Sequence, residues 1–427
     1  MQLPVFPVVA LLAHVLALLS LVVAQDSPLW IQGGLESAVA TDAAVYNTGG
    51  TIVINGFTMT VPKNVLVQFP AAWVPFKDFA ASQQKFIGYE TLACISPTHL
   101  LVIGNTVDDV PLVAQIILYE FFEGLSSGFI ETVNFTDGSM KIKHGPTVRI
   151  NDPKGVFSVG YTGNPFMTAD GESPSVTAFS GFPMCIPRNS TDPLCPLRQR
   201  PSAGPGIFTA RDPLVMAPLQ PGDFITFSGF REGNEVVATT IVAQNVQILT
   251  VGDIVYVRME LARIGIDNPS PNADAADSRL LGFVTNNRVS VNLYAMDVDP
   301  CTGKVTDRIL ANVGLRGGRN EQNVFRWDTP ILSGYVREYR AVAMIGNVPK
   351  TRLTKNGIMS GQAVQPVNVW IQAEQLVPGT PPVPFDFSQM AFLTAGVGRD
   401  ENGNIWGPLD PFPQSGMLID PPVCPAP

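Results

Sequence analysis

The feature that most constrains the fold is a strand–turn–strand pattern that occurs twice. Residues 50–62 read GTIVINGFTMTVP, in which alternating apolar residues flank the dipeptide Asn55-Gly56. This dipeptide favours a tight hairpin because both turn positions need a positive φ. The pattern recurs over Ile130–Ile142 around an Asp-Gly turn, and a short apolar segment follows each copy. The chain is therefore expected to build small antiparallel sheets.

Further strands are expected along the rest of the chain, and their rhythm is similar to that of five-stranded, OB-like barrels. They are predicted at Leu219–Gly229, Val236–Ile248, Val289–Val298, Gly334–Met344 and Val367–Leu376. One segment, Val110–Glu123, is so densely apolar that it fits either a helix or a buried strand. We predict a mainly β fold of two β-barrel or sandwich-like domains, with long loops and few helices.

Composition supports this prediction and suggests the domain limits. The chain has 38 Gly and 38 Pro without a fixed period, 45% hydrophobic residues and 15% charged residues, which argues against a helical or a disordered chain. We expect an N-terminal β domain at 25–250, with a Pro/Gly-rich insertion at 154–218. A C-terminal β domain at 251–427 is expected to end in an extended tail.

The N-terminus predicts the compartment. Residues 1–24 carry no charged side chain and contain a long apolar run, which is typical of a secretory signal peptide; a membrane anchor is the alternative. No later apolar run is long enough to span a bilayer. We therefore expect a protein of the secretory pathway, either secreted or vesicular.

Secretion gives meaning to two other features. Asn134 and Asn189 each begin an Asn-x-Ser/Thr acceptor for glycosylation. Cys185 and Cys195 flank a Pro-rich, polar stretch and are expected to form a local disulfide, and Cys301 with Cys424 is a second pairing to consider.

Several classes of function are disfavoured. The net charge of −9 argues against a nucleic-acid partner, because phosphate contacts need clustered Lys and Arg. The sequence has no C-x-x-C pair and no Gly-rich phosphate loop between a strand and a helix, so we expect neither a metal nor a cofactor. A hydrolase whose separated acids, such as Asp223 and Glu374, converge on folding stays possible.

The best candidates for chemistry are strand faces that carry polar and aromatic side chains. A period of two places Tyr335, Arg337 and Tyr339 on one face, where two phenols and a guanidinium can donate hydrogen bonds to an oxygen-rich ring. The alternative is that they form an ordinary sheet face with cross-strand pairs. A register shift of one residue would exchange Arg337 for Glu338.

A second face, on the segment that begins at Val367, carries Asn368, Trp370, Gln372 and Glu374. It would supply an aromatic wall, amide donors and one carboxylate for a ligand. Trp73 and Trp327 are further aromatic candidates for binding a substrate. Ligands commonly occupy polar faces at the mouth of a barrel.

A family resemblance gives these candidates a possible reaction. The segments Thr51–Phe57, Val61–Phe76 and Gly361–Glu374, in a secreted β-rich chain without a cofactor motif, resemble fungal secreted proteins of secondary-metabolite pathways. The characterised members are the hetero-Diels–Alderases of tropolone-sesquiterpenoid biosynthesis. The resemblance implies a cofactor-free reaction in which a hydroxymethyl tropolone loses water to give an ortho-quinone methide. A humulene-type sesquiterpene alkene then adds across it and closes a dihydropyran ring.

In this interpretation the partners are small tropolone and terpenoid molecules. Arg337, Tyr335 and Tyr339 would act as catalytic donors that hold the tropolone oxygens and assist the loss of water. Trp370 and Trp73 would form an apolar wall that keeps the terpene in attack geometry. The alternative function is a secreted, non-catalytic binding or surface protein.

Overall fold

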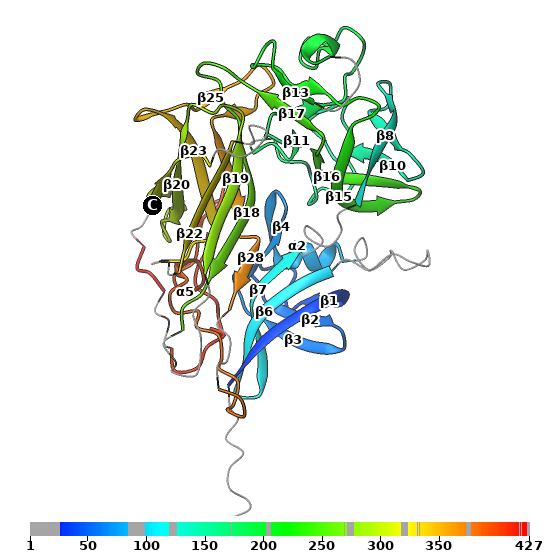
Figure 1. Ribbon diagram of the computed structural model, residues 1–427. Coiled ribbons are helices and arrows are strands. Elements are labelled where there is room, and N and C mark those ends of the chain that lie inside the picture. Colours follow the sequence, from blue (N-terminus) through cyan, green and yellow to red (C-terminus); the bar gives the residue numbers. More distant parts are fainter. Residues whose placement is uncertain are drawn as a thin grey trace, which may run out of the picture.

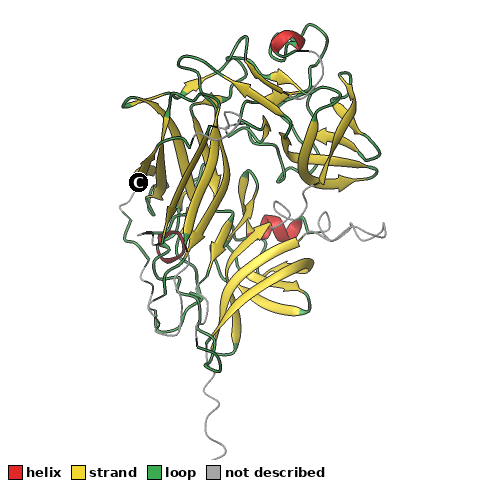
Figure 2. Ribbon diagram, viewed as in Figure 1, coloured by secondary structure: helices red, strands yellow, loops and turns green. Residues whose placement is uncertain are grey.

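The computed structural model describes residues 26–83, 99–118, 126–171, 173–201, 206–268, 270, 277–316, 323–330, 332, 334–372, 377–417, 419 and 421–424. The expected signal peptide, Cys94 and Glu374 lie outside these residues. Figures 1 and 2 show a molecule made mostly of strands and loops, which confirms the mainly β prediction. Within the described residues the helical elements are α2 (Phe76–Ala81), α5 (Ala391–Thr394) and the short 3-10 turn η1 (Leu197–Gln199). Neither of these α-helices is long and apolar enough to cross a membrane.

The first hairpin pattern belongs to a closed, curled sheet that we call the first barrel. Its strands are β1 (Ser27–Ala40), β2 (Gly50–Ile54), β3 (Phe57–Val61), β6 (His99–Val107) and β7 (Val110–Leu118). The order is β3-β2-β1-β6-β7, and a parallel pairing of Thr60 with Leu112 connects β3 back to β7. Asn55 and Gly56 both adopt positive φ in the turn, as the hairpin prediction requires.

Strand β7 resolves the ambiguous segment Val110–Glu123, whose described part is a strand rather than a helix. It pairs with β6 on one side and with β3 and β4 (Leu66–Phe69) on the other. Its residues from Leu112 onward are almost all buried, so a dense apolar run replaces the usual alternation. β4 pairs in turn with β5 (Ala72–Pro75), and α2 follows directly.

The second hairpin pattern begins a second closed sheet, which we call the second barrel. Its strands are β8 (Ser126–Asn134), β9 (Ser139–Ile142), β10 (Thr147–Ile150), β15 (Phe224–Glu232) and β16 (Glu235–Ala243). Antiparallel pairings run in the order β10-β9-β8-β15-β16, and parallel pairing of β10 with β16 closes the ring. Both barrels thus connect their strands in the same order, with the third and fifth strands parallel, as in an OB-like barrel. The stretch 25–250 therefore contains two barrels.

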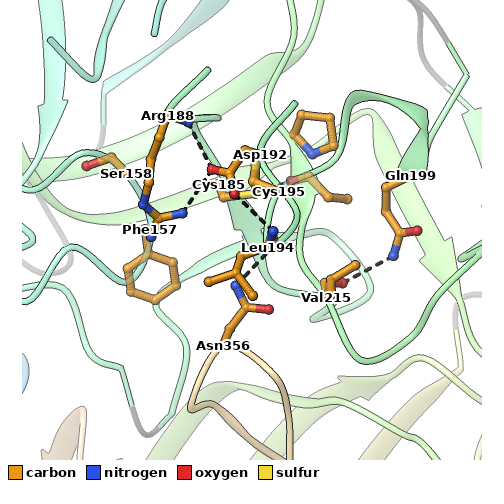
Figure 3. Close-up of a disulfide and its surroundings, with 12 residues drawn as sticks. Phe157, Ser158, Cys185, Arg188, Asp192, Leu194, Cys195, Gln199, Val215 and Asn356 are labelled. Atoms are coloured by element: carbon orange, nitrogen blue, oxygen red, sulfur yellow. Dashed lines mark hydrogen bonds and ion pairs between the residues drawn. A yellow bond between two sulfur atoms is a disulfide. The ribbon is translucent and has the colours of Figure 1, made fainter. Parts of the chain in front are cut away.

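A long insertion separates β10 from β15 in the second barrel. It carries β11 (Val176–Ala178), β12 (Met184–Cys185), η1, β13 (Gly206–Thr209) and β14 (Ala217–Pro218), and β13 pairs with β17 (Val246–Leu249). A disulfide joins Cys185 to Cys195, with a Cα–Cα distance of 6.1 Å. Figure 3 shows this disulfide with the ion pair of Arg188 and Asp192 beside it. Both links lie within the insertion, and the parallel pairing of β11 with β16 attaches the insertion to the second barrel.

Residues 257–371 form a β-sandwich. One sheet has the order β22 (Val324–Thr329), β19 (Ser278–Val284), β18 (Val257–Gly265) and β28 (Val369–Ile371). The other has the order β21 (Val305–Val313), β20 (Ser290–Val298) and β23 (Glu338–Ile345), with β24 (Val348–Pro349) and β27 (Gln362–Pro366) also paired to β23. A small hairpin of β25 (Arg352–Leu353) and β26 (Met359–Ser360) precedes β27. Buried apolar side chains fill the space between the sheets.

The tail expected at the C-terminus is an arm, residues 377–424, that connects the sandwich to the first barrel. It contains α5, β29 (Gly398–Arg399) and β30 (Ile405–Trp406). The Asn105 amide of β6 donates hydrogen bonds of 2.9 Å to the carbonyl oxygens of Phe385 and Pro413. A disulfide between Cys301 and Cys424 attaches the end of the arm to the β20–β21 turn. The arm therefore fixes the first barrel beside the sandwich.

Candidate ligand-binding cleft

A cleft lies where the two barrels and the sandwich meet, and it has two adjoining chambers. The larger one, about 690 Å³, is called the charged chamber, and the smaller one, about 250 Å³, is called the hydroxyl chamber. Pro70, Asp170 and Pro366, one from each unit, line both chambers. The larger volume falls in the range typical of small-molecule sites.

One wall of the hydroxyl chamber is the outer face of the second barrel. Ile225 and Phe227 of β15 point into the barrel core, so the alternating residues Thr226 and Ser228 face outward to the chamber. Neighbouring strands add Thr177 and Thr240. The opposite wall comes from β18 and β27 of the sandwich and is largely apolar, with Val257, Met259, Ala363 and Val364. The chamber therefore combines hydroxyl groups with apolar surface.

A clamped arginine lies at the sandwich wall of the hydroxyl chamber. The Arg258 guanidinium carbon lies 4.7 Å from the ring centre of Phe283 and 5.5 Å from that of Phe179. Its Nε and Nη2 donate to the Phe179 carbonyl oxygen, and Nη1 pairs with Glu260. Burial lowers the pKa of Arg258, and the Glu260 carboxylate opposes that shift. The side chain of Glu260 stays 45% exposed, so its carboxylate can also accept hydrogen bonds from a ligand.

The register of β23 decides which charges line the charged chamber. Tyr339 is fully buried in the sandwich, so its neighbours Glu338 and Arg340 line the chamber. Arg340 donates a 2.7 Å hydrogen bond to Asp307 on β21, which holds its guanidinium in place. The same wall includes Lys154 from the insertion of the second barrel and Trp73 from β5. It therefore carries both positive and negative charges.

The insertion is tied to the sandwich around the cleft. The Ser173 hydroxyl accepts a 2.7 Å hydrogen bond from the backbone N–H of Val364 on β27. The amide of Asn356, which lines the charged chamber, donates a 3.1 Å hydrogen bond to the carbonyl oxygen of Leu194 beside the disulfide, as Figure 3 shows. Lys355 forms a 2.7 Å ion pair with Asp212. These contacts give the cleft a largely preformed shape.

The predicted catalytic residues lie apart from the cleft. Tyr335 and Tyr339 are buried in the sandwich core, where burial raises the pKa of both phenols. The Tyr335 hydroxyl accepts a 2.9 Å hydrogen bond from the backbone N–H of Asp267. Arg337 packs over Trp73 with 4.4 Å between its guanidinium carbon and the ring centre. None of the three lines either chamber.

The predicted substrate-binding residues divide in the same way. Trp73 lines the charged chamber. Asn368, Trp370 and Gln372 are buried, and Trp370 packs against the rings of Tyr335 and Phe392. The Asn368 side-chain oxygen accepts a hydrogen bond of 2.6 Å from the backbone N–H of Ala262, so it connects β18 to β28. Trp327 is half-buried at the edge of the same core.

Sequence reasoning missed most of the residues that line the cleft. Glu338 and Arg340 alternate with residues that were singled out, and the register of β23 was the missing information. Asp170 and Lys154 lie in loops without a motif. The two acceptors for glycosylation, Asn134 and Asn189, are both exposed. Among the residues that the structure describes, no group of three or more His, Cys, Asp or Glu side chains is placed to bind a metal ion.

Comparison with known proteins adds no assignment to this geometry. Neither a scan against protein-family models nor a search of curated proteins gives a match to this chain.

Proposed function

We propose that the protein is a secreted binding protein that holds an amphipathic small molecule in the cleft between its three β units. The observation that carries this proposal is the pair of adjoining chambers with different surfaces. The charged chamber offers Glu338, Arg340 and Lys154 to a polar group, whereas the hydroxyl chamber offers apolar surface to the rest of the ligand.

Secretion is part of the proposal, and it is supported by two kinds of residue. The two disulfides are typical of chains that fold in an oxidising compartment. The apolar N-terminal run of residues 1–24 is typical of a secretory signal.

The test is to obstruct the junction of the two chambers. Val364 lines both chambers, so Val364→Trp should fill the space where a ligand would cross between them. Val348→Trp is the matched control because Val348 lies on the same sheet but is 57% exposed. Melting temperatures would be measured with a panel of terpenoid alcohols, tropolones and oligosaccharides. At least one class should raise the melting temperature of the wild type and of the control, and Val364→Trp should lose that response.

Two results together would contradict this function. One is a panel in which no compound shifts the melting temperature. The other is a native mass spectrum of the secreted protein that shows no retained small molecule.

A second candidate is the cofactor-free hetero-Diels–Alderase reaction implied by the family resemblance. The adjoining chambers favour it because two unlike reactants, a polar tropolone and an apolar terpene, would need adjacent sites of opposite character. In this version Arg340 and Lys154, which line the charged chamber, are the donors to the tropolone oxygens.

The reaction is tested by incubating the protein with a hydroxymethyl tropolone and a humulene-type alcohol. The tropolone loses one water, and the alkene then adds to the quinone methide with no further reagent. Arg340→Met should slow product formation, whereas Arg352→Met, at an exposed position on β25, should leave its rate unchanged. A product yield and ratio equal to those without protein would exclude this function.

A further inference from the structure

A second, smaller cavity of about 30 Å³ lies between the first barrel, the sandwich and the C-terminal arm, apart from the cleft. Trp73 and Gln115 line it from the first barrel, Arg337 from the sandwich, and Phe392 and Leu409 from the arm. Trp73 also lines the charged chamber, so its indole separates the two spaces. A cavity of this size has room for a water-sized molecule or a small ion.

Arg337 is the charged residue of this cavity, and its guanidinium lies within ion-pair distance of no carboxylate among the described residues. The guanidinium packs on the indole of Trp73 at 4.4 Å. Its side-chain N–H groups donate no hydrogen bond to any described residue, and its Nε is fully buried. Burial lowers the pKa of Arg337, and the negative charge of Glu338 opposes that shift. Glu338 itself lines the charged chamber.

A partly buried guanidinium whose Nε–H has no acceptor is unfavourable unless a negative charge accompanies it. Stacking on an indole recovers part of that cost, but it leaves the buried Nε–H of Arg337 without an acceptor among the described residues. Gln115 adds a second unsatisfied group, because its buried side-chain oxygen also has no partner among the described residues. By turning its amide, Gln115 can present an NH₂ group to the cavity instead.

We propose that this cavity binds a small monovalent anion, either a halide or the carboxylate of a small organic acid, through the guanidinium of Arg337. The anion would neutralise the half-buried guanidinium and accept hydrogen bonds from its N–H groups. Because barrel, sandwich and arm all line the cavity, the bound anion would also hold the arm in place. This site is independent of the ligand proposed for the cleft.

The test compares chloride and formate with gluconate, an anion too large for the cavity, at constant ionic strength with sodium as the cation. Chloride or formate should raise the melting temperature of the full-length protein saturably, by about 2–4 °C at ten times its dissociation constant. Gluconate should not. A response to chloride alone identifies a halide site, and a response to formate at lower concentration identifies a carboxylate site.

Two variants locate the response. Arg337→Met keeps the length of the side chain and should abolish the saturable shift. Arg352→Met, which removes an exposed charge on β25, should retain it. Should Arg337→Met fail to fold, the line width of the chloride NMR resonance on the wild type, with formate as competitor, provides the same answer. Equal behaviour in chloride, formate and gluconate, or an unchanged shift in Arg337→Met, would overturn the proposal.

Discussion

The buried ion pair of Arg200 and Asp223 supports the sharpest prediction about stability. Their side chains are 1% and 0% exposed, and both carboxylate oxygens accept hydrogen bonds of 2.7 Å from the guanidinium. The Asp223 carboxylate, directly before β15, also accepts a 2.9 Å hydrogen bond from the backbone N–H of Gln220. Asp223→Asn preserves the shape of the side chain and removes its charge. Because the Arg200 charge would then stay buried without its counter-charge, we expect a loss of about 3–5 kcal/mol in the second barrel.

Hydrogen exchange followed by mass spectrometry is the appropriate assay, because the chain has several units and one unfolding midpoint would average over them. Exchange of the slowest amides in β8 and β15 should accelerate roughly 10²- to 10⁴-fold. Lys63→Met is the control, since its ion pair with Asp410 has side chains that are 58% and 67% exposed, and it should change exchange in the second barrel very little. If Asp223→Asn behaves like the control, the argument from burial is wrong. Replacing both Arg200 and Asp223 by apolar residues should recover much of the loss.

Three further predictions concern acid, the arm and the surface. Two arginines lower the pKa of Asp328 to about 2. Its carboxylate therefore stabilises the folded chain at pH values above its ordinary pKa, and this stabilisation is lost as the pH falls toward 2. Melting temperatures of Asp328→Asn and wild type should differ at neutral pH and converge near pH 2. Cys301→Ser should release the end of the arm from its attachment to Cys424 and destabilise the fold by about 2–4 kcal/mol, and unchanged proteolysis of the arm would contradict this. Secretion from a glycosylating host should add glycans at Asn134 and Asn189, each detected as a mass lost on enzymatic deglycosylation.

The hairpins show what local sequence can predict. The Asn55-Gly56 turn and its Asp-Gly counterpart specify where the chain reverses, because few residues adopt the positive φ that such turns need. The strand rhythm likewise indicated OB-like barrels. It did not separate one barrel from two, because closure depends on parallel pairings between strands far apart in sequence.

The candidate sites show where local reasoning stops. The alternation of side chains along Tyr335–Arg340 defines two faces of the strand. Which face lines a cleft depends on the side against which the other sheet packs. Packing between the sheets buries Tyr335 and Tyr339 and leaves Glu338 and Arg340 at the cleft. The aromatic character that suggested a ligand wall instead fills the sandwich core.

Local sequence patterns specify the secondary-structure class, the hairpins and the acceptors for glycosylation, because these depend on turn chemistry, alternation and short motifs. The cleft and the cavity around Arg337, by contrast, arise only from the packing of whole units in three dimensions. Both form where three units meet, and their linings come from residues hundreds of positions apart, such as Trp73 and Arg337. No local pattern encodes such a meeting, since it follows from how whole barrels and sheets bury their surfaces against one another.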